Sequence, residues 1–411
     1  MTLPLLSRRA ALGSAAAMGL AGFARRARAE DATVRIGILT DLNGPNAAGT
    51  GKGAVTSTHL AAEDFMAAHP GIKVEIQVAD YQSKPDVATS IARGWIDQQG
   101  VDVISNVNNS AAALAIASLV REKNKVALFT APASSDLTGK ACSPNHVHWD
   151  YDTWALGHST GGGIVAEGGD SWFFVAADYA FGRALARDTA AFVTGAGGKV
   201  LGTVYTPFPE TTDFSAYLLQ AQASGAKVLG LANSGTNTTD CIKQGAEFGL
   251  LQKMKVAALL MTIPDLHGVG LPAAQGLLLS ESFYWDMNDD TRAYAKRFGA
   301  RMGGFMPSMM QAGDYSAVTH YLKAIVALGP EKRGDGRAVV SAMKAMPTDD
   351  PLFGKGSIRP DGRKLNPFYL FQVKSPAESR YPWDYYKLIH TTPADQAFRP
   401  LAEGGCPLVS L

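Results

Sequence analysis

Apolar and polar positions alternate along the chain in blocks that predict strands followed by helices. In the first part of the chain, short apolar runs typical of buried strands occupy residues 34–40, 73–80, 101–105 and 126–130. Segments whose apolar residues repeat with helical spacing lie between them, at residues 54–68, 85–100 and 111–124. Strands that alternate with helices in this way predict a parallel sheet with helices on both faces.

The same alternation restarts after a polar and aromatic stretch at residues 142–154. Further strands are predicted at residues 172–176, 200–205, 228–232, 256–260 and 277–281. Helices are predicted between them at residues 181–194, 213–224 and 236–249. Two such runs joined by a break predict an α/β fold with two doubly wound lobes, each built on a parallel sheet.

The first 29 residues have the pattern of an export signal that the mature protein lacks. The arginine pair in Ser7–Arg9 precedes an uncharged run at residues 10–24, and Ala27–Ala29 has the small-x-small pattern of a cleavage site. The arginine pair and Leu12 resemble a twin-arginine signal, but neighbouring positions depart from it, so the general secretory route stays open. We expect cleavage after about Ala29 and a periplasmic mature protein; a transit peptide or a retained anchor is the alternative.

Removing this signal changes the charge of the chain. Five arginines and no acid are lost, so the formal net charge falls from +1 to −4. A mildly acidic surface argues against nucleic acids and anionic membranes as partners. The rest of the sequence contains no apolar run near the roughly 20 residues that span a membrane.

Three cysteines remain in the mature chain, Cys142, Cys241 and Cys406. The periplasm is oxidising and permits one disulfide, which leaves one thiol over. Cys241 lies in a predicted helix, where a small buried hydrophobic residue is its expected role. Cys142 and Cys406 both lie in loops, so they are the favoured pair.

Residues 157–161 match G-x-S-x-G, the pattern of a serine-hydrolase nucleophile elbow, with Ser159 and His158 as candidate catalytic residues. The elbow requires a strand before the serine and a helix after it. Residues 152–156 instead have the pattern of a helix start, so small residues in a packed helix explain the string equally well. A secreted serine hydrolase is kept as an alternative.

Two further sets of residues are candidates for binding a metal or an anion. Cys142, His146, His148 and Asp150 are metal-ligand types, and His-x-His on a strand places both rings on one face. No C-x-x-C or H-E-x-x-H motif supports them, so we favour a polar strand that leads into a crossover and expect no metal. The glycine-rich segment 44–53 fails the Walker and Rossmann spacings, yet its N–H groups at a helix start suit a ligand acceptor or anion.

Six short motifs follow one another between residues 33 and 400. They are strand 34–40 with the turn at residues 43–45, residues 103–119, residues 129–135, Asp178–Gly182, Asp213–Ser215 and Gln244–Gly249. In this order and behind an export signal, they resemble periplasmic solute-binding proteins of the branched-chain amino-acid (leucine/isoleucine/valine-binding) type. The resemblance implies the type I periplasmic binding fold, in which two lobes joined by three crossovers close on a small solute. It also implies a monomeric, non-enzymatic protein without a cofactor, whose partners are the permease and ATPase of an ABC importer.

The resemblance gives expected lobe boundaries. The first lobe is expected to comprise residues 30–151 with 285–360, and the second residues 152–284 with 361–411. The chain would then cross between lobes near Asp150, Tyr284 and Arg359.

The resemblance also gives an expected binding site. Asn109 and Ser110 match a loop that holds a ligand carboxylate, and Ala133 and Ser134 match the second half of that grip. The second lobe is expected to supply the remaining ligand contacts, namely Tyr179, Phe181, Ser234 or Gly235, Thr262 and Tyr284.

The expected ligand class follows from one difference between this chain and the amino-acid-binding members of the family. Amino-acid-binding members place an acid near residues 260–263 to pair with the ligand ammonium, whereas this chain has no carboxylate there before Asp265. Because a buried ammonium without a partner is costly, an apolar or aromatic carboxylate is favoured over a branched-chain amino acid. A sensing subunit of a signalling system with the same fold is the alternative to a transport protein.

Overall fold

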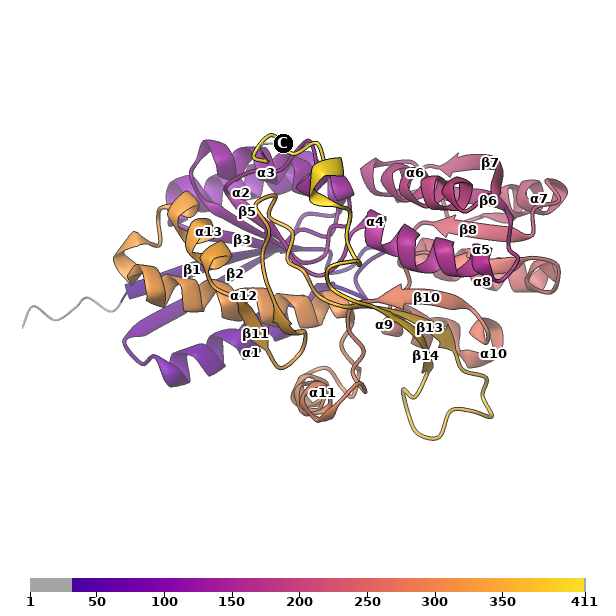
Figure 1. Ribbon diagram of the computed structural model, residues 1–411. Coiled ribbons are helices and arrows are strands. Elements are labelled where there is room, and N and C mark those ends of the chain that lie inside the picture. Colours follow the sequence, from indigo (N-terminus) through magenta and orange to yellow (C-terminus); the bar gives the residue numbers. More distant parts are fainter. Residues whose placement is uncertain (1–31, 410–411) are drawn as a thin grey trace, which may run out of the picture.

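A computed structural model describes residues 32–409, so the expected export signal lies outside the described residues. The chain forms two α/β lobes, which lie side by side in Figure 1. Within residues 32–409, none of the helices combines the length and apolar character that crossing a membrane requires.

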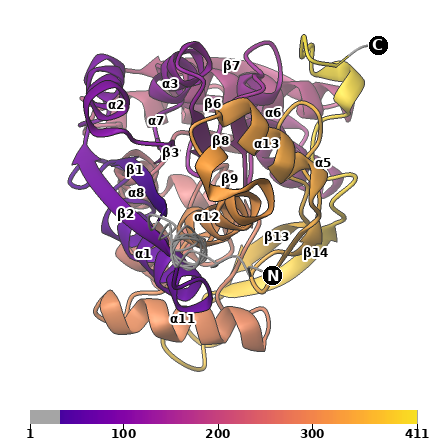
Figure 2. The same cartoon turned by 90° about the vertical axis from the view of Figure 1, so that its left-hand side faces the viewer.

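The first lobe contains a five-stranded parallel sheet of order β2-β1-β3-β4-β5. Its strands are β1 (Ala32–Thr40), β2 (Ile72–Asp80), β3 (Val103–Asn106), β4 (Val126–Phe129) and β5 (His146–His148). The helices around it are α1 (Gly51–Ala68), α2 (Pro85–Gln99), α3 (Ser110–Glu122), α11 (Asp289–Arg301), α12 (Met309–Leu328) and α13 (Gly336–Ala345). In Figure 2, which faces this lobe, α2 and α3 lie above the strands, and α1 and α11 lie below them.

Alternation of side chains along the strands explains these two layers. On β1, Ile36 and Ile38 are buried in the core shared with α1 and α12, whereas Leu39 is buried in the core shared with α2 and α3. Local signals set the helix ends as the sequence predicts: Pro85 starts α2, and Gly100 ends it with a left-handed φ of 67°.

The second lobe contains a seven-stranded sheet of order β14-β13-β10-β9-β8-β6-β7. Its parallel strands are β6 (Ser171–Ala177), β7 (Lys199–Thr206), β8 (Val228–Ala232), β9 (Lys255–Ala258) and β10 (Leu278–Glu281). Its helices are α4 (Thr153–Leu156), α5 (Gly162–Ala166), α6 (Ala180–Gly195), α7 (Ser215–Ala223), α8 (Thr236–Glu247), α9 (Ile263–Val269) and α10 (Leu271–Ala274).

One edge of this sheet differs from the expected all-parallel arrangement. β13 (Phe368–Val373) pairs antiparallel with β10, and β14 (Tyr386–Thr392) pairs antiparallel with β13. A separate two-stranded hairpin is formed by β11 (Thr348–Asp350) and β12 (Gly354–Gly356). A hairpin needs no crossover helix, so it can extend a parallel sheet at its edge.

The last described residues differ from the expected lobe boundaries, which placed residues 361–411 in the second lobe. Cys406 forms a disulfide with Cys142, in the loop between β4 and β5 of the first sheet. Arg399 donates from Nη2 to the carbonyl of Ser135 in the same loop, at 2.9 Å. These two links hold the end of the chain against the first lobe after it has left β14.

Candidate functional site

The loops that follow parallel strands of both sheets meet in a cleft between the lobes, where ligands of open α/β sheets bind. They enclose a cavity of about 20 Å³. The first lobe lines it with Asn46, Thr50, Asn108, Ala131 and Ala133. The second lobe lines it with Tyr179, Phe181, Ser234 and Leu260. Because roughly 10–15 Å³ holds one water molecule, the lobes are closed tightly on each other in this structure.

The loop after β1 reaches across the cleft. The carboxylate of Asp41 accepts hydrogen bonds from the backbone N–H groups of Gly44, at 2.6 Å, and Asn46, at 3.2 Å. The N–H groups expected to suit an anion therefore bind the loop's own carboxylate. This holds the loop in the position from which Asn46 reaches the second lobe.

Two hydrogen bonds join the lobes at this point. Ser234 Oγ donates to Asn46 Oδ1 at 2.9 Å, and the Thr236 N–H donates to the Pro45 carbonyl at 3.0 Å. Gly235 lies between them with a left-handed φ of 56°, and a Cβ there would overlap the Pro45 carbonyl oxygen. The close approach of the two backbones therefore requires glycine at position 235.

A second cavity of about 10 Å³ shares Asn46, Ser234 and Leu260 with the first. Thr262 and Asp265 lie in its wall. Asp265 Oδ2 accepts from the Thr262 N–H at 2.9 Å and from its hydroxyl at 2.6 Å, which caps α9. Burial raises the pKa of Asp265 above its ordinary value. Among residues 32–409, Asp265 is the only carboxyl that lines either cavity, and it is held by a helix cap.

Six of the ten expected ligand contacts line these two cavities: Ala133, Tyr179, Phe181, Ser234, Gly235 and Thr262. Tyr179 stacks on Phe208 with ring centroids 4.5 Å apart, so its ring is fixed at the cleft. Tyr284 lies instead in the second-lobe core, where its hydroxyl donates to the Trp383 carbonyl at 3.1 Å.

The other three expected contacts have structural hydrogen bonds within the first lobe. Asn109 caps α3, since its Oδ1 accepts from the N–H groups of Ala111 and Ala112 at 2.9 and 3.1 Å. Ser110 Oγ accepts from the N–H groups of Ala133 and Ser134, at 3.3 and 3.2 Å. Ser134 Oγ accepts weakly from the N–H of Asp136, at 3.4 Å.

Several residues that line the cavities are not predicted from the sequence as ligand contacts. Asn46 and Thr50 lie in the glycine-rich segment 44–53, and the position of this segment directly after a strand indicates that it lies at the cleft. Asn108 lies one residue before the expected grip. Met310 enters from α12, and no local pattern relates that helix to the cleft.

The candidate metal ligands and the candidate catalytic serine have other structural roles. His146 Nε2 and His148 Nε2 donate to the carbonyls of Leu137 and Pro132, at 2.8 and 2.7 Å, and Cys142 is in its disulfide. Across the described range, no three His, Cys, Asp or Glu side chains gather as metal ligands. Ser159 lies in a π-helical turn at Gly157–Gly161 that follows α4, so the strand that a nucleophile elbow needs is replaced by helix.

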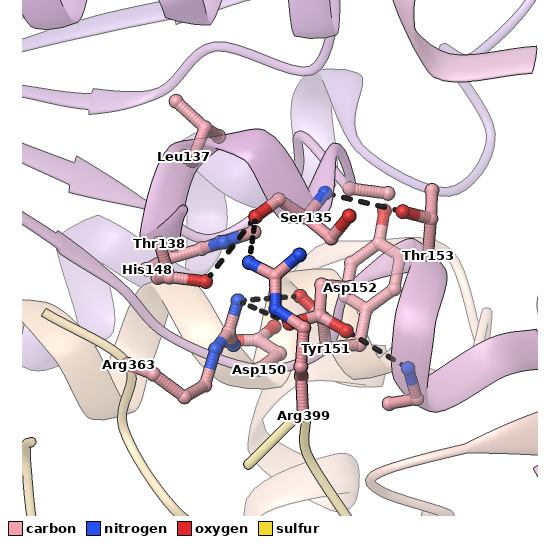
Figure 3. A network of polar contacts seen from close by, with 12 residues as sticks. Ser135, Leu137, Thr138, His148, Asp150, Tyr151, Asp152, Thr153, Arg363 and Arg399 are labelled. Carbon is pink, nitrogen blue, oxygen red and sulfur yellow. Dashed lines mark hydrogen bonds and ion pairs between the residues drawn. The ribbon is translucent and has the colours of Figure 1, made fainter. Parts of the chain in front are cut away.

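The first and third crossovers run alongside each other and are joined by polar contacts (Figure 3). The His148 N–H donates to the Gly362 carbonyl at 2.9 Å. Arg363, fully buried, donates from Nη2 to the Tyr151 carbonyl at 3.1 Å and lies 3.3 Å from an Asp152 carboxylate oxygen. Tyr151 lines the cleft, so this junction also positions part of its wall.

Comparison with known proteins agrees with this arrangement. A family model described as periplasmic binding protein matches residues 33–379. The chain belongs to the periplasmic binding protein family. A crystal structure of a periplasmic binding protein from Burkholderia mallei is 44% identical over 92% of this chain and 100% of that one, with a TM-score of 0.89. No curated protein sequence matches the chain.

Two further solved structures are of binding proteins from ABC transporters. A branched-chain amino acid ABC transporter periplasmic ligand-binding protein from Burkholderia xenovorans is 40% identical over 91% of this chain and 99% of that one, with a TM-score of 0.80. A solute-binding protein from R. palustris, in complex with benzoate, is 18% identical over 91% and 99%, with a TM-score of 0.77, and shares the fold. This periplasmic binding protein is therefore of the ABC-transporter type, which implies a periplasmic location.

Proposed function

We propose that the protein captures a small apolar or aromatic carboxylate between its lobes and delivers it to the permease and ATPase of an ABC importer. The observation that supports this proposal is a cavity that residues of both lobes line. At its edge, Asn46 of the first lobe and Ser234 of the second are joined by a hydrogen bond. A ligand that contacts both walls binds the closed form better than the open one, so binding favours closure.

The chemistry of the wall supports an apolar or aromatic carboxylate. Tyr151, Tyr179 and Phe181 supply aromatic surface. Among the described residues, no Lys or Arg lines either cavity, so polar ligand atoms are met by neutral groups such as the Asn108 amide. Neutral donors that are held in place can bind a carboxylate through hydrogen bonds to its charged form.

The presence of Asp265 in the cavity wall supports a second candidate ligand class. These ligands also carry an ammonium group, as amino acids do. The Asp265 carboxyl lies in the wall of the smaller cavity and could pair with a cation. Against this, its Oδ2 already accepts two hydrogen bonds from Thr262. The two candidates differ in whether Asp265 contributes to binding.

A thermal-shift panel on the mature protein separates them. Benzoate and related arylcarboxylates should raise the melting temperature more than leucine, isoleucine or valine do. A ligand at 100 times its Kd stabilises the folded protein by about 2.7 kcal/mol, which such a panel detects. If branched-chain amino acids are the strongest ligands, and Asp265→Asn weakens leucine binding much more than benzoate binding, the second candidate is correct and the first is wrong.

A further inference from the structure

Asn108 lies in the loop that follows β3, at the wall of the cleft. Its side chain is 7% exposed and lines the larger cavity. The two residues before it, Asn106 and Val107, have left-handed φ values of 72° and 58°. Such a conformation is strained for a β-branched residue such as Val107, and strain of this kind gathers at functional sites. The turn at these two residues directs the backbone so that the side chain of Asn108 lies in the wall of the cleft.

The hydrogen bonds of Tyr81 fix which way the Asn108 amide points. The Tyr81 hydroxyl oxygen accepts from the Asn109 N–H at 2.7 Å, and the hydroxyl lies 2.8 Å from Asn108 Oδ1. A tyrosine hydroxyl has a single hydrogen, and here it must donate that hydrogen to an acceptor. The carbonyl oxygen of Asn108 therefore faces Tyr81, and its NH₂ group faces away.

That NH₂ group is a buried donor without an acceptor. Within residues 32–409, Asn108 Nδ2 has no hydrogen-bond partner. Buried donors are almost always paired, so an unpaired one at a cavity wall calls for an explanation. The neighbouring Asn109 offers the contrast, because its Oδ1 caps α3 and its Nδ2 donates to the Ser83 carbonyl at 3.3 Å.

We propose that Asn108 is a specificity-determining residue, whose NH₂ group donates to a carboxylate oxygen of the ligand. This rests on the proposed function, since it assigns one contact within the same cavity. Tyr81 acts as a positioning residue, because it holds the amide with its donors toward the ligand. At this point the cavity selects a hydrogen-bond acceptor and rejects an ammonium group or another donor.

Two substitutions of similar size test the proposal by titration calorimetry, with benzoate and L-leucine as the probes. Asn108→Leu removes the donor and should weaken binding of a carboxylate roughly 10- to 100-fold. Asn108→Asp replaces the donor with an acceptor and a negative charge, so it should weaken binding at least a further 10-fold. Tyr81→Phe frees the amide to rotate and should give a smaller loss than Asn108→Leu.

Asn288→Asp is the matched control. Asn288 is an exposed residue that caps α11, and aspartate caps a helix as well as asparagine does, so this variant adds the same charge away from the cleft. It should bind both probes as the wild type does. Melting of each variant without ligand shows whether the fold is intact.

The outcomes separate this proposal from the proposed function. Binding within twofold of wild type in both Asn108 variants would overturn the Asn108 assignment alone. An Asn108→Asp protein that binds as tightly as Asn108→Leu, or more tightly, would show that the ligand presents a donor there. If the wild type binds neither benzoate nor L-leucine, the proposed ligand class is wrong and the Asn108 assignment is wrong with it.

Discussion

Glu281 ends β10 with its carboxyl fully buried, and the Tyr386 hydroxyl donates to it at 2.7 Å. The pKa of Glu281 is raised from an ordinary 4.5 to about 8, chiefly by burial. The neighbouring charge of Asp265 contributes to this rise, and hydrogen bonds to the carboxylate oppose it. At neutral pH the folded protein therefore keeps a proton at this carboxyl that the unfolded chain releases.

This difference predicts a pH-dependent stability. Below pH 4.5 both states bind the proton, and the stabilising contribution is fully present. As the pH rises toward about 8 only the folded state keeps the proton, so the free energy of unfolding falls. One such group gives a slope of up to about 1.4 kcal/mol per pH unit. Glu281→Gln, which has no proton to release, should show a flatter fall between pH 5 and 8 in urea unfolding. Equal slopes in wild type and variant would contradict this assignment.

At the scale of residues, the sequence predicts the loops that line the cleft but not which of their side chains face it. The sequence predicts Asn109 and Ser110 as ligand contacts, whereas Asn108 has its side chain in the cavity wall. The left-handed turn at Asn106 and Val107 decides this. Asparagine favours such a conformation but a β-branched valine does not, so the sequence gives no clear signal of the turn. Met310 was missed because its contact depends on how α12 packs on the other elements.

At the scale of elements, the loop between β4 and β5 connects three parts of the chain. Ser135 Oγ donates to Asp188 Oδ2 in α6 at 2.7 Å, and the Ser135 carbonyl accepts from Arg399 at 2.9 Å. Figure 3 shows Ser135 and Arg399 beside the crossover residues Asp152 and Thr153. The disulfide to Cys406 fixes the end of the chain on this loop.

Loss of this disulfide should destabilise the whole fold. Cys142 and Cys406 are 264 residues apart, so their bond restricts a very long stretch of the unfolded chain. The double variant Cys142→Ser/Cys406→Ser should lose about 2–5 kcal/mol of unfolding free energy, as is typical for a native disulfide. Denaturant unfolding of the oxidised wild type and the variant measures the difference. A loss below about 1 kcal/mol would mean that the rest of the tail holds the loop without the covalent bond.

The sequence predicts most strands and helices up to residue 281, because each has its own local pattern of apolar residues. The short helices α5, α9 and α10 are not among them. The sequence did not predict that β13 and β14 extend the second sheet antiparallel to β10. It also assigned residues 361–411 to the second lobe, although the favoured Cys142–Cys406 pair, which the structure confirms, ties the chain end to the first lobe. Both features depend on contacts between residues far apart in the sequence, and local periodicity carries no information about those contacts.

At the scale of the whole molecule, the repeated strand–helix pattern was enough to predict two lobes. The closed arrangement was not predictable, because it depends on Asn46 meeting Ser234 and on Ser135 meeting Asp188 across the lobes. We propose that the three crossovers near Asp150, Tyr284 and Arg359 act as the hinge. Only a few residues there need to change φ and ψ for the lobes to separate.

The central claim is that ligand capture and lobe closure are one event, and small-angle X-ray scattering tests it most directly. The ligand-free mature protein should have a larger radius of gyration than the closed structure in Figure 1. Saturation with the strongest ligand from the thermal-shift panel should reduce the radius toward that of the closed structure, because a ligand that touches both walls shifts the equilibrium toward closure. A ligand-free radius larger than that of the closed structure, and unchanged at saturating ligand, would contradict capture by closure.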